Sequence, residues 1–275
     1  MTNLSKPKCT APGAPRRWAV VCGRLKLAAG LLALSLGTAV AATPPDGWWL
    51  DIVNDRETDV RRMLGRGVDP NAANSEGLPA LMLAIRTGAW GVYDALLAHR
   101  KTDIEARNRS NETPLMYLAL LGETERAQAL IKRGAQVNRL GWTPLHYAAS
   151  KGQTATARML LDHGAIVNAP APDGTTPLMM AAYAGDRATV QLLLDHGADA
   201  SAVNLQKLTA ADWARERRHG ALANELDAIA TRTRALREGR PLPEQDSATS
   251  KKKVDDVGEP DTGTSRYFDL ERFNR

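Results

Sequence analysis

The chain has 275 residues, of which 36 are basic and 31 acidic, and its formal net charge is +5 at neutral pH. Six of the basic residues and both cysteines, Cys9 and Cys22, lie in the first 42 positions. The remainder has 30 basic and 31 acidic residues and no cysteine, which excludes an internal disulfide and thiolate chemistry there. Its near-neutral charge gives no support for nucleic-acid binding, which calls for clustered basic residues.

Residues 1–42 have the composition of a secretory signal peptide. Basic residues precede an apolar run at 27–40, and small residues follow it up to Ala42. The run is short for a membrane helix, which needs about 20 apolar residues. We expect cleavage after Ala42 by the general secretion route, since the context of Arg16-Arg17 fits a twin-arginine signal poorly. An uncleaved inner-membrane anchor and full secretion are the alternatives to a periplasmic location.

The next part of the chain, 43–238, repeats itself. Residues 141–165 and 174–198 agree at 15 of 25 positions without a gap, and keep Thr-Pro-Leu, Ala-Ala and Leu-Leu-Asp-His-Gly-Ala. The same starting position recurs at spacings of 34, 30, 33 and 33, and is occupied by Pro79, Thr113, Thr143, Thr176 and Thr209. A fixed period of this size is typical of a solenoid of stacked repeats.

Each repeat is predicted to be two short helices with a turn before them. Apolar residues fall at helical spacing, as Leu145, Ala148 and Ala149 do in one repeat. Thr143 is expected to be an N-cap, and the proline after it stands at the first helical position, where it loses no hydrogen bond. Glycines such as Gly152 follow, where a helix has to end.

The motifs "TPLHYAA" and "LLDHGA" and the period of 33 residues resemble the ankyrin repeat. The resemblance covers about residues 46–230 and implies an all-α ankyrin-repeat solenoid of helix-turn-helix units with short β-hairpin-like fingers. About six units are expected, including an incomplete amino-terminal cap and a carboxyl-terminal cap, where Lys207 replaces the usual Gly or Asn. Between Asn138 and Thr143 the chain is three residues shorter than at the equivalent step from Asn168, so one finger is trimmed.

The resemblance implies that variable residues on the finger tips and on the concave face of the first helices bind a partner. One row of large side chains lies one turn into each first helix and is predicted to be an exposed apolar strip: Leu83, Tyr117, Tyr147, Met180 and Trp213. A second row lies three residues further on: Arg86, Leu120, Ser150, Tyr183 and Glu216. The alternative is that these side chains lean into the groove between units and are partly core.

Among the finger tips, the expected contacts are Glu76, Arg109, Glu112, Trp142 and Asp173. Trp142 is the strongest candidate, because a large aromatic side chain on an exposed turn requires a reason. A charged tip is otherwise simply solvated.

No residue pattern indicates catalysis or a cofactor. His163 and His196 precede helix-ending glycines in identical contexts, where an imidazole interacts with the last helical carbonyls. The chain has no metal-binding or nucleophile motif, so we expect no enzyme, no metal and no cofactor. An enzyme or a metal-dependent module is a distant alternative.

Residues 239–275 are poor in apolar residues and are predicted to be disordered. They end in "RYFDLERFNR", which contains Tyr267, Phe268, Leu270 and Phe273. This cluster is either a docking motif, for another protein or for the repeats themselves, or part of an inert tail.

The expected function is non-catalytic protein binding in the periplasm, by a monomer that touches no nucleic acid and, once the signal is cleaved, no membrane. The alanine- and arginine-rich composition and the signal peptide indicate a Gram-negative bacterium. Similar bacterial ankyrin proteins imply a protective or scaffolding role, for example in oxidative-stress defence. The alternative is an immunity protein that neutralises a toxin.

Overall fold

The computed structural model describes residues 44–240 of the chain. In this part the chain forms twelve α-helices and no strand, with one isolated β-bridge between Ala73 and Pro79. The predicted all-α fold of paired helices is confirmed. The predicted signal peptide lies outside the described residues, as do residues 241–275 with Tyr267, Phe268, Leu270 and Phe273.

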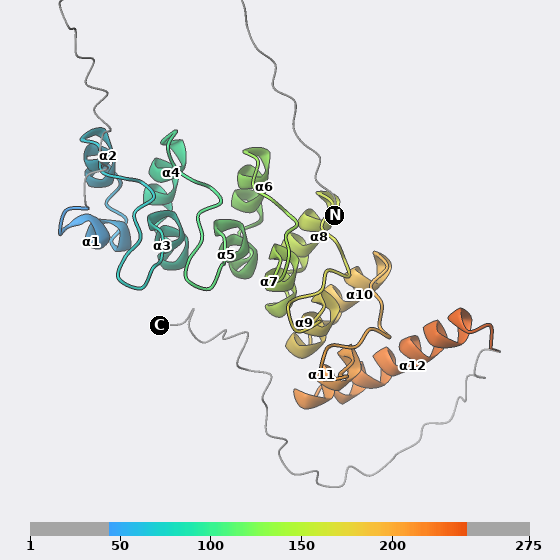
Figure 1. The fold of residues 1–275 in the computed structure, drawn as a ribbon. Coiled ribbons are helices and arrows are strands. Elements are labelled where there is room, and N and C mark those ends of the chain that lie inside the picture. Colours follow the sequence, from blue (N-terminus) through green and yellow to red (C-terminus); the bar gives the residue numbers. More distant parts are fainter. Residues whose placement is uncertain (1–43, 241–275) are drawn as a thin grey trace, which may run out of the picture. The chain divides into compact units, whose positions relative to one another are not determined.

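The helices form six pairs that follow one another along the chain (Figure 1). We call the first helix of each pair the inner helix and the second the outer helix. The inner helices are α1 (Trp48–Val53), α3 (Ala80–Thr87), α5 (Pro114–Leu121), α7 (Pro144–Ser150), α9 (Pro177–Ala184) and α11 (Ala210–Glu216). The outer helices are α2 (Glu57–Gly65), α4 (Trp90–Ala98), α6 (Thr124–Lys132), α8 (Thr154–Asp162), α10 (Arg187–Asp195) and α12 (Gly220–Arg237).

The inner helices begin as their sequences predict. Thr113, Thr143, Thr176 and Thr209 are N-caps with extended backbones, and proline follows the first three. The hydroxyl of Thr176 accepts a hydrogen bond from the backbone N–H of Met179 at 3.4 Å. Such a cap satisfies one of the N–H groups that the first helical turn leaves without a partner.

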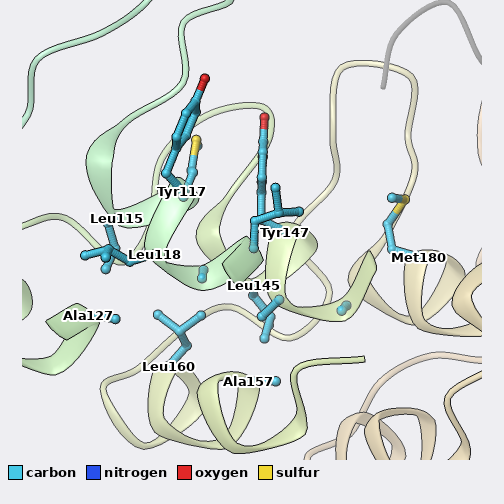
Figure 2. Packing of buried hydrophobic residues seen from close by; sticks show 14 of the residues in the cluster. Leu115, Tyr117, Leu118, Ala127, Leu145, Tyr147, Ala157, Leu160 and Met180 are labelled. Carbon is cyan, nitrogen blue, oxygen red and sulfur yellow. The ribbon is translucent and has the colours of Figure 1, made fainter. Parts of the chain in front are cut away.

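The core runs through the stack as one continuous cluster of side chains. Helix α7 packs against α5 on one side, α9 on the other, and its own outer helix α8, so all seven of its residues are buried. Ala148 and Ala149 have no exposed surface, and their small side chains allow the neighbouring helices to come close. Figure 2 shows Leu145 of α7 facing Leu160 and Ala157 of α8 within this core.

The turn between inner and outer helices depends on glycine for two reasons. Gly152 has a φ of +64°, a conformation that residues with a side chain adopt only at a cost. A Cβ atom at Gly152 would also lie 2.8 Å from the Cβ of Asp186, which belongs to the next repeat. The glycine therefore permits both the turn and the close approach of the following unit.

Candidate functional site

Five loops, which we call fingers, connect each outer helix to the next inner helix; they are residues 71–79, 105–113, 138–143, 168–176 and 201–209. Each finger turns at a residue of positive φ, which lies two positions before the N-cap residue of the following inner helix. These turn residues are Gly77, Asn111, Gly141, Gly174 and Lys207. Lys207 thus adopts the left-handed conformation that glycine or asparagine provides in the other fingers. The shared turn fixes which residues occupy the finger tips.

Asparagine side chains join neighbouring repeats at the finger bases. Asn168 donates to the carbonyl of Gly197 at 3.0 Å and accepts from the N–H of Asp199 at 2.9 Å. Asn138 makes the equivalent pair of bonds with Gly164 and Ile166. Asn138 precedes its helix-start threonine by five residues and Asn168 by eight, so the structure confirms that the third finger is three residues shorter.

The prediction of an exposed apolar strip on the inner helices is wrong. Leu83, Tyr117, Tyr147, Met180 and Trp213 retain only 2–6% of their surface, and Leu120 of the second row retains 3%. The inner helices α3, α5, α7 and α9 each pack against two inner neighbours and their own outer helix, and α11 packs against α9 and α12, so these side chains are covered by neighbouring helices. The partly-core alternative describes these side chains better, and Figure 2 shows Tyr117 and Tyr147 side by side on neighbouring helices.

Glu112 is a buried link between repeats, although the sequence predicts an exposed finger tip. Only 2% of its surface is exposed. Its carboxylate accepts hydrogen bonds from the hydroxyl of Tyr147 at 2.6 Å and from the side-chain amide of Asn108 at 2.5 Å. Because Tyr147 lies one repeat further along, this network fixes the second finger onto the fourth inner helix, α7.

Trp142 is half-buried, so its expected exposure is also incorrect. Its indole meets the ring of His146 edge-on, with the ring centroids 5.2 Å apart. His146 is fully buried, and burial lowers its pKa to about 4. Its Nδ1 accepts from the N–H of Thr143 at 3.2 Å, while Nε2 lies 3.1 Å from the carbonyl of Thr175 in the next repeat.

The other predicted contacts lie at or near the surface. Glu76 is exposed and forms an ion pair with the half-buried Arg86 at 3.1 Å. Arg109 is exposed, and its guanidinium donates to the carbonyl of Ser75 on the preceding finger at 2.8 Å. Asp173 is half-buried and accepts from its neighbour Thr175.

Sequence reasoning missed the most exposed apolar side chains of the fingers. Leu140 is 98% exposed and Leu205 is 74% exposed. At the position of Leu140 the other fingers have the polar residues Glu76, Ser110, Asp173 and Gln206. The sequence signal for this surface is the apolar residue at position 140, where the other fingers are polar.

Leu140 and Leu205 lie on the third and fifth fingers, and the fourth finger lies between them and touches both. The exposed Pro172 lies next to Gly141, where an added Cβ would be 3.5 Å from the proline ring. The N–H of Leu205 donates to the carbonyl of Asp173 at 2.8 Å. Leu140, Pro172 and Leu205 therefore lie on three adjacent fingers, and we call this set of exposed apolar side chains the apolar finger edge.

The two histidines before helix-ending glycines act as the sequence predicts. Nδ1 of His163 lies 2.8 Å from the carbonyl of Met159, and His196 makes the same bond with Leu192. Both imidazoles satisfy carbonyls in the last helical turn. Within residues 44–240, no group of three or more His, Cys, Asp or Glu side chains is placed to hold a metal ion.

In the described part of the chain, no helix has both the length and the apolar character needed to cross a bilayer. Segments 52–140, 91–171 and 119–204 each match the family described as "Ankyrin repeats (3 copies)", and together they span more than half of the chain.

Curated relatives include the neurogenic locus notch homolog protein 2 of Homo sapiens and that of Mus musculus, both 35% identical over 83 residues. The notch homolog protein 1 of Rattus norvegicus is 34% identical over the same length. These matches cover 30% of this chain and only 3% of each relative, so the similarity concerns the repeats alone. Ankyrin repeats are generally non-catalytic modules for protein–protein interaction, and the chain belongs to the ankyrin-repeat family.

Proposed function

We propose that the chain is an exported, non-catalytic module that binds a partner protein in the periplasm through the apolar finger edge. The observation that carries this proposal is the exposure of Leu140 and Leu205, at 98% and 74%, on fingers whose turns need no apolar side chain. Exposed apolar residues scattered singly are normal, but exposed apolar residues on adjacent fingers are typical of a contact surface.

The fold supports this use of the finger edge. The fingers are tied to one another by backbone and side-chain hydrogen bonds, such as those of Leu205 and Arg109. A surface that is already ordered loses little conformational freedom on binding, so more of the contact energy remains as affinity. The half-buried Arg86 and its ion pair with the exposed Glu76 give the same face a polar margin at its amino-terminal end.

Photo-crosslinking tests the binding surface. A photoreactive amino acid replaces Leu140 in one variant, Leu205 in a second, and Leu236 on α12 in a control, because Leu236 is also well exposed at 63%. We expect positions 140 and 205 to crosslink to one common protein that position 236 does not reach. Equal crosslinking at all three positions, or none at the fingers, contradicts the proposal.

The identity of the crosslinked protein tests the biological role. We propose a protective or scaffolding role, of which oxidative-stress defence is one form, and this predicts an enzyme of peroxide metabolism or another housekeeping protein as the partner. A secreted toxin bound one-to-one instead supports the role of an immunity protein.

Cell fractionation tests the proposed export. The predicted product begins at Thr43 and is found in the periplasmic fraction. A full-length amino terminus in the membrane fraction supports an uncleaved anchor, and a full-length protein in the cytoplasm refutes export.

A further inference from the structure

A second surface lies at the opposite ends of the inner helices from the fingers. A hollow of about 460 Å³ is formed where α7, α9 and α11 end. It is lined by Lys151, Tyr183, Glu216, Arg217, Arg218 and His219, among others. We call it the basic hollow, and it belongs to none of the contacts that hold the fingers together.

The floor of the basic hollow is aromatic. Tyr183 is half-buried and packs edge-on against Trp213, with the ring centroids 5.5 Å apart. The guanidinium of Arg217 lies over the ring of Tyr183, 4.6 Å from its centroid. This stacking orients one cation on the wall of the hollow and restricts its side chain before any ligand arrives.

Three exposed cations of the basic hollow have no acidic partner. Among the described residues, Lys151, Arg217 and Arg218 make no ion pair and no side-chain hydrogen bond. The nearby Arg215, by contrast, pairs with two acids, Asp212 at 2.7 Å and Asp227. Glu216 also lines the hollow, so the positive charge of the hollow is reduced but not cancelled.

Arg218 occupies a backbone position that disfavours it. Its φ is +64°, and the equivalent residues of the four preceding repeats are glycines: Gly88, Gly122, Gly152 and Gly185. In the preceding repeats a side chain there would meet the next repeat, as the contact between Gly152 and Asp186 shows. Within residues 44–240, no further helix pair follows the one that contains Arg218. The site thus tolerates a side chain, yet the left-handed backbone is still unfavourable for arginine compared with glycine.

In the first helix pair, the turn between inner and outer helix also has a non-glycine residue of positive φ, Asp55. A hydrogen bond of its side chain explains this backbone conformation. Asp55, with a φ of +51°, accepts a hydrogen bond from the N–H of Val92 at 2.8 Å and so caps α4 of the next repeat. Arg218 has no comparable bond within residues 44–240. A strained residue without a structural contact points to a functional reason for keeping it.

Basic residues near helix C-termini also stabilise the helix dipole. This effect accounts for Lys151 and Arg217, which are the C-cap residues of α7 and α11. It accounts less well for Arg218, which lies beyond the helix end, and it does not explain why cations from two repeats converge over an aromatic floor.

We propose that the basic hollow binds an acidic peptide segment of a partner protein, with the carboxylates between Lys151, Arg217 and Arg218. The cations complement the negative charge, and the half-buried Tyr183 in the lining offers a contact for an apolar side chain within the segment. The proposal rests on the proposed protein-binding function, but it concerns a surface separate from the apolar finger edge and can fail independently of it.

The test uses the full chain and a fluorescein-labelled peptide of ten residues in which glutamate and glycine alternate. Fluorescence anisotropy is measured at low salt and at physiological salt, where charges are screened beyond about 8 Å. We expect saturable binding that weakens as salt rises, and no binding of the matched peptide with glutamine in place of glutamate.

Arg218→Gly is the decisive variant, because it removes a cation and also relieves the left-handed backbone. We expect affinity for the glutamate peptide to fall about threefold to fivefold, while thermal stability stays equal or rises. Lys207→Gly is the matched control, since Lys207 has a φ of +65° on a finger away from the hollow, and it should leave peptide affinity unchanged. In a triple variant with Lys151→Gln, Arg217→Gln and Arg218→Gly, the affinity for the glutamate peptide should fall at least about tenfold.

The proposal is overturned if the glutamate peptide does not bind, if the triple variant binds it as well as the unaltered chain, or if a ten-nucleotide thymidine oligomer binds the hollow more tightly than the peptide. The double variant Leu140→Ser, Leu205→Ser should retain peptide binding. Crosslinking of one common protein from positions 140 and 205, with no peptide binding by the unaltered chain, would refute the basic hollow alone.

Discussion

Protonation of His146 should destabilise the stack in mild acid. Its pKa is about 4 in the folded protein and 6.5 when unperturbed, because burial disfavours the charged imidazole. The geometry agrees: Nδ1 faces the backbone N–H of Thr143, which can only donate, so a proton on Nδ1 would break this contact. The folded protein therefore holds a neutral ring that the unfolded chain protonates readily.

The sign and size of the effect follow from this difference. A folded-state pKa below the unfolded value means that the unfolded chain binds more protons as the pH falls below 6.5, so stability is lost toward pH 4. Between about pH 7.5 and about pH 4.5, the free energy of unfolding should fall by about 2.5 kcal/mol from this residue alone.

The repeats themselves supply the control. His146→Met places the residue that three other repeats have at the same position, as Met82, Met116 and Met179. The sulfurs of Met116 and Met179 accept from the threonine N–H at 3.4 Å. Urea unfolding of both proteins is followed by circular dichroism at the two pH values. On going from the higher to the lower pH, the free energy of unfolding of the unaltered chain should fall by about 2.5 kcal/mol more than that of the variant. Equal decreases in the two proteins would refute a neutral, buried imidazole.

Three further changes test the packing. Gly152→Ala should destabilise by about 1–3 kcal/mol more than Gly164→Ala in thermal or urea unfolding, since both glycines have positive φ but only the first approaches the next repeat; equal effects would contradict the close approach. Tyr93→Phe should be neutral or stabilise by about 1 kcal/mol, because the buried hydroxyl has no hydrogen-bond partner within residues 44–240 and burial raises its pKa to about 12; a clear loss of stability would contradict an unsatisfied hydroxyl. Glu112→Gln should cost about 1 kcal/mol or more through weakened bonds to Tyr147 and Asn108, and an unchanged unfolding midpoint would argue against the carboxylate link.

Features that repeat in the sequence were predictable because they fix the backbone of each unit. The caps at Thr143 and Thr176, the left-handed glycines and the carbonyl contacts of His163 and His196 all follow from local helix geometry. The shortened finger could be predicted from the spacing alone.

Exposure was harder to predict, because it depends on neighbours that periodicity does not place. The residue one turn into an inner helix looks outward on an isolated helix pair, but in the stack Tyr147 meets the finger that carries Glu112. The half-burial of Trp142 has a more local cause, because its ring rests against His146 of the same repeat. The basic hollow combines residues from three repeats, and no single repeat contains its pattern.

Affinity measurements with the purified partner identified by crosslinking test the central claim most directly. The account predicts that Leu140→Ser with Leu205→Ser weakens binding at least about tenfold, since two exposed leucines lose the burial that the complex would give them. Leu236→Ser, at an exposed leucine of α12, should leave the dissociation constant unchanged. Full affinity in the double finger variant, with the fold intact, would contradict binding through the apolar finger edge.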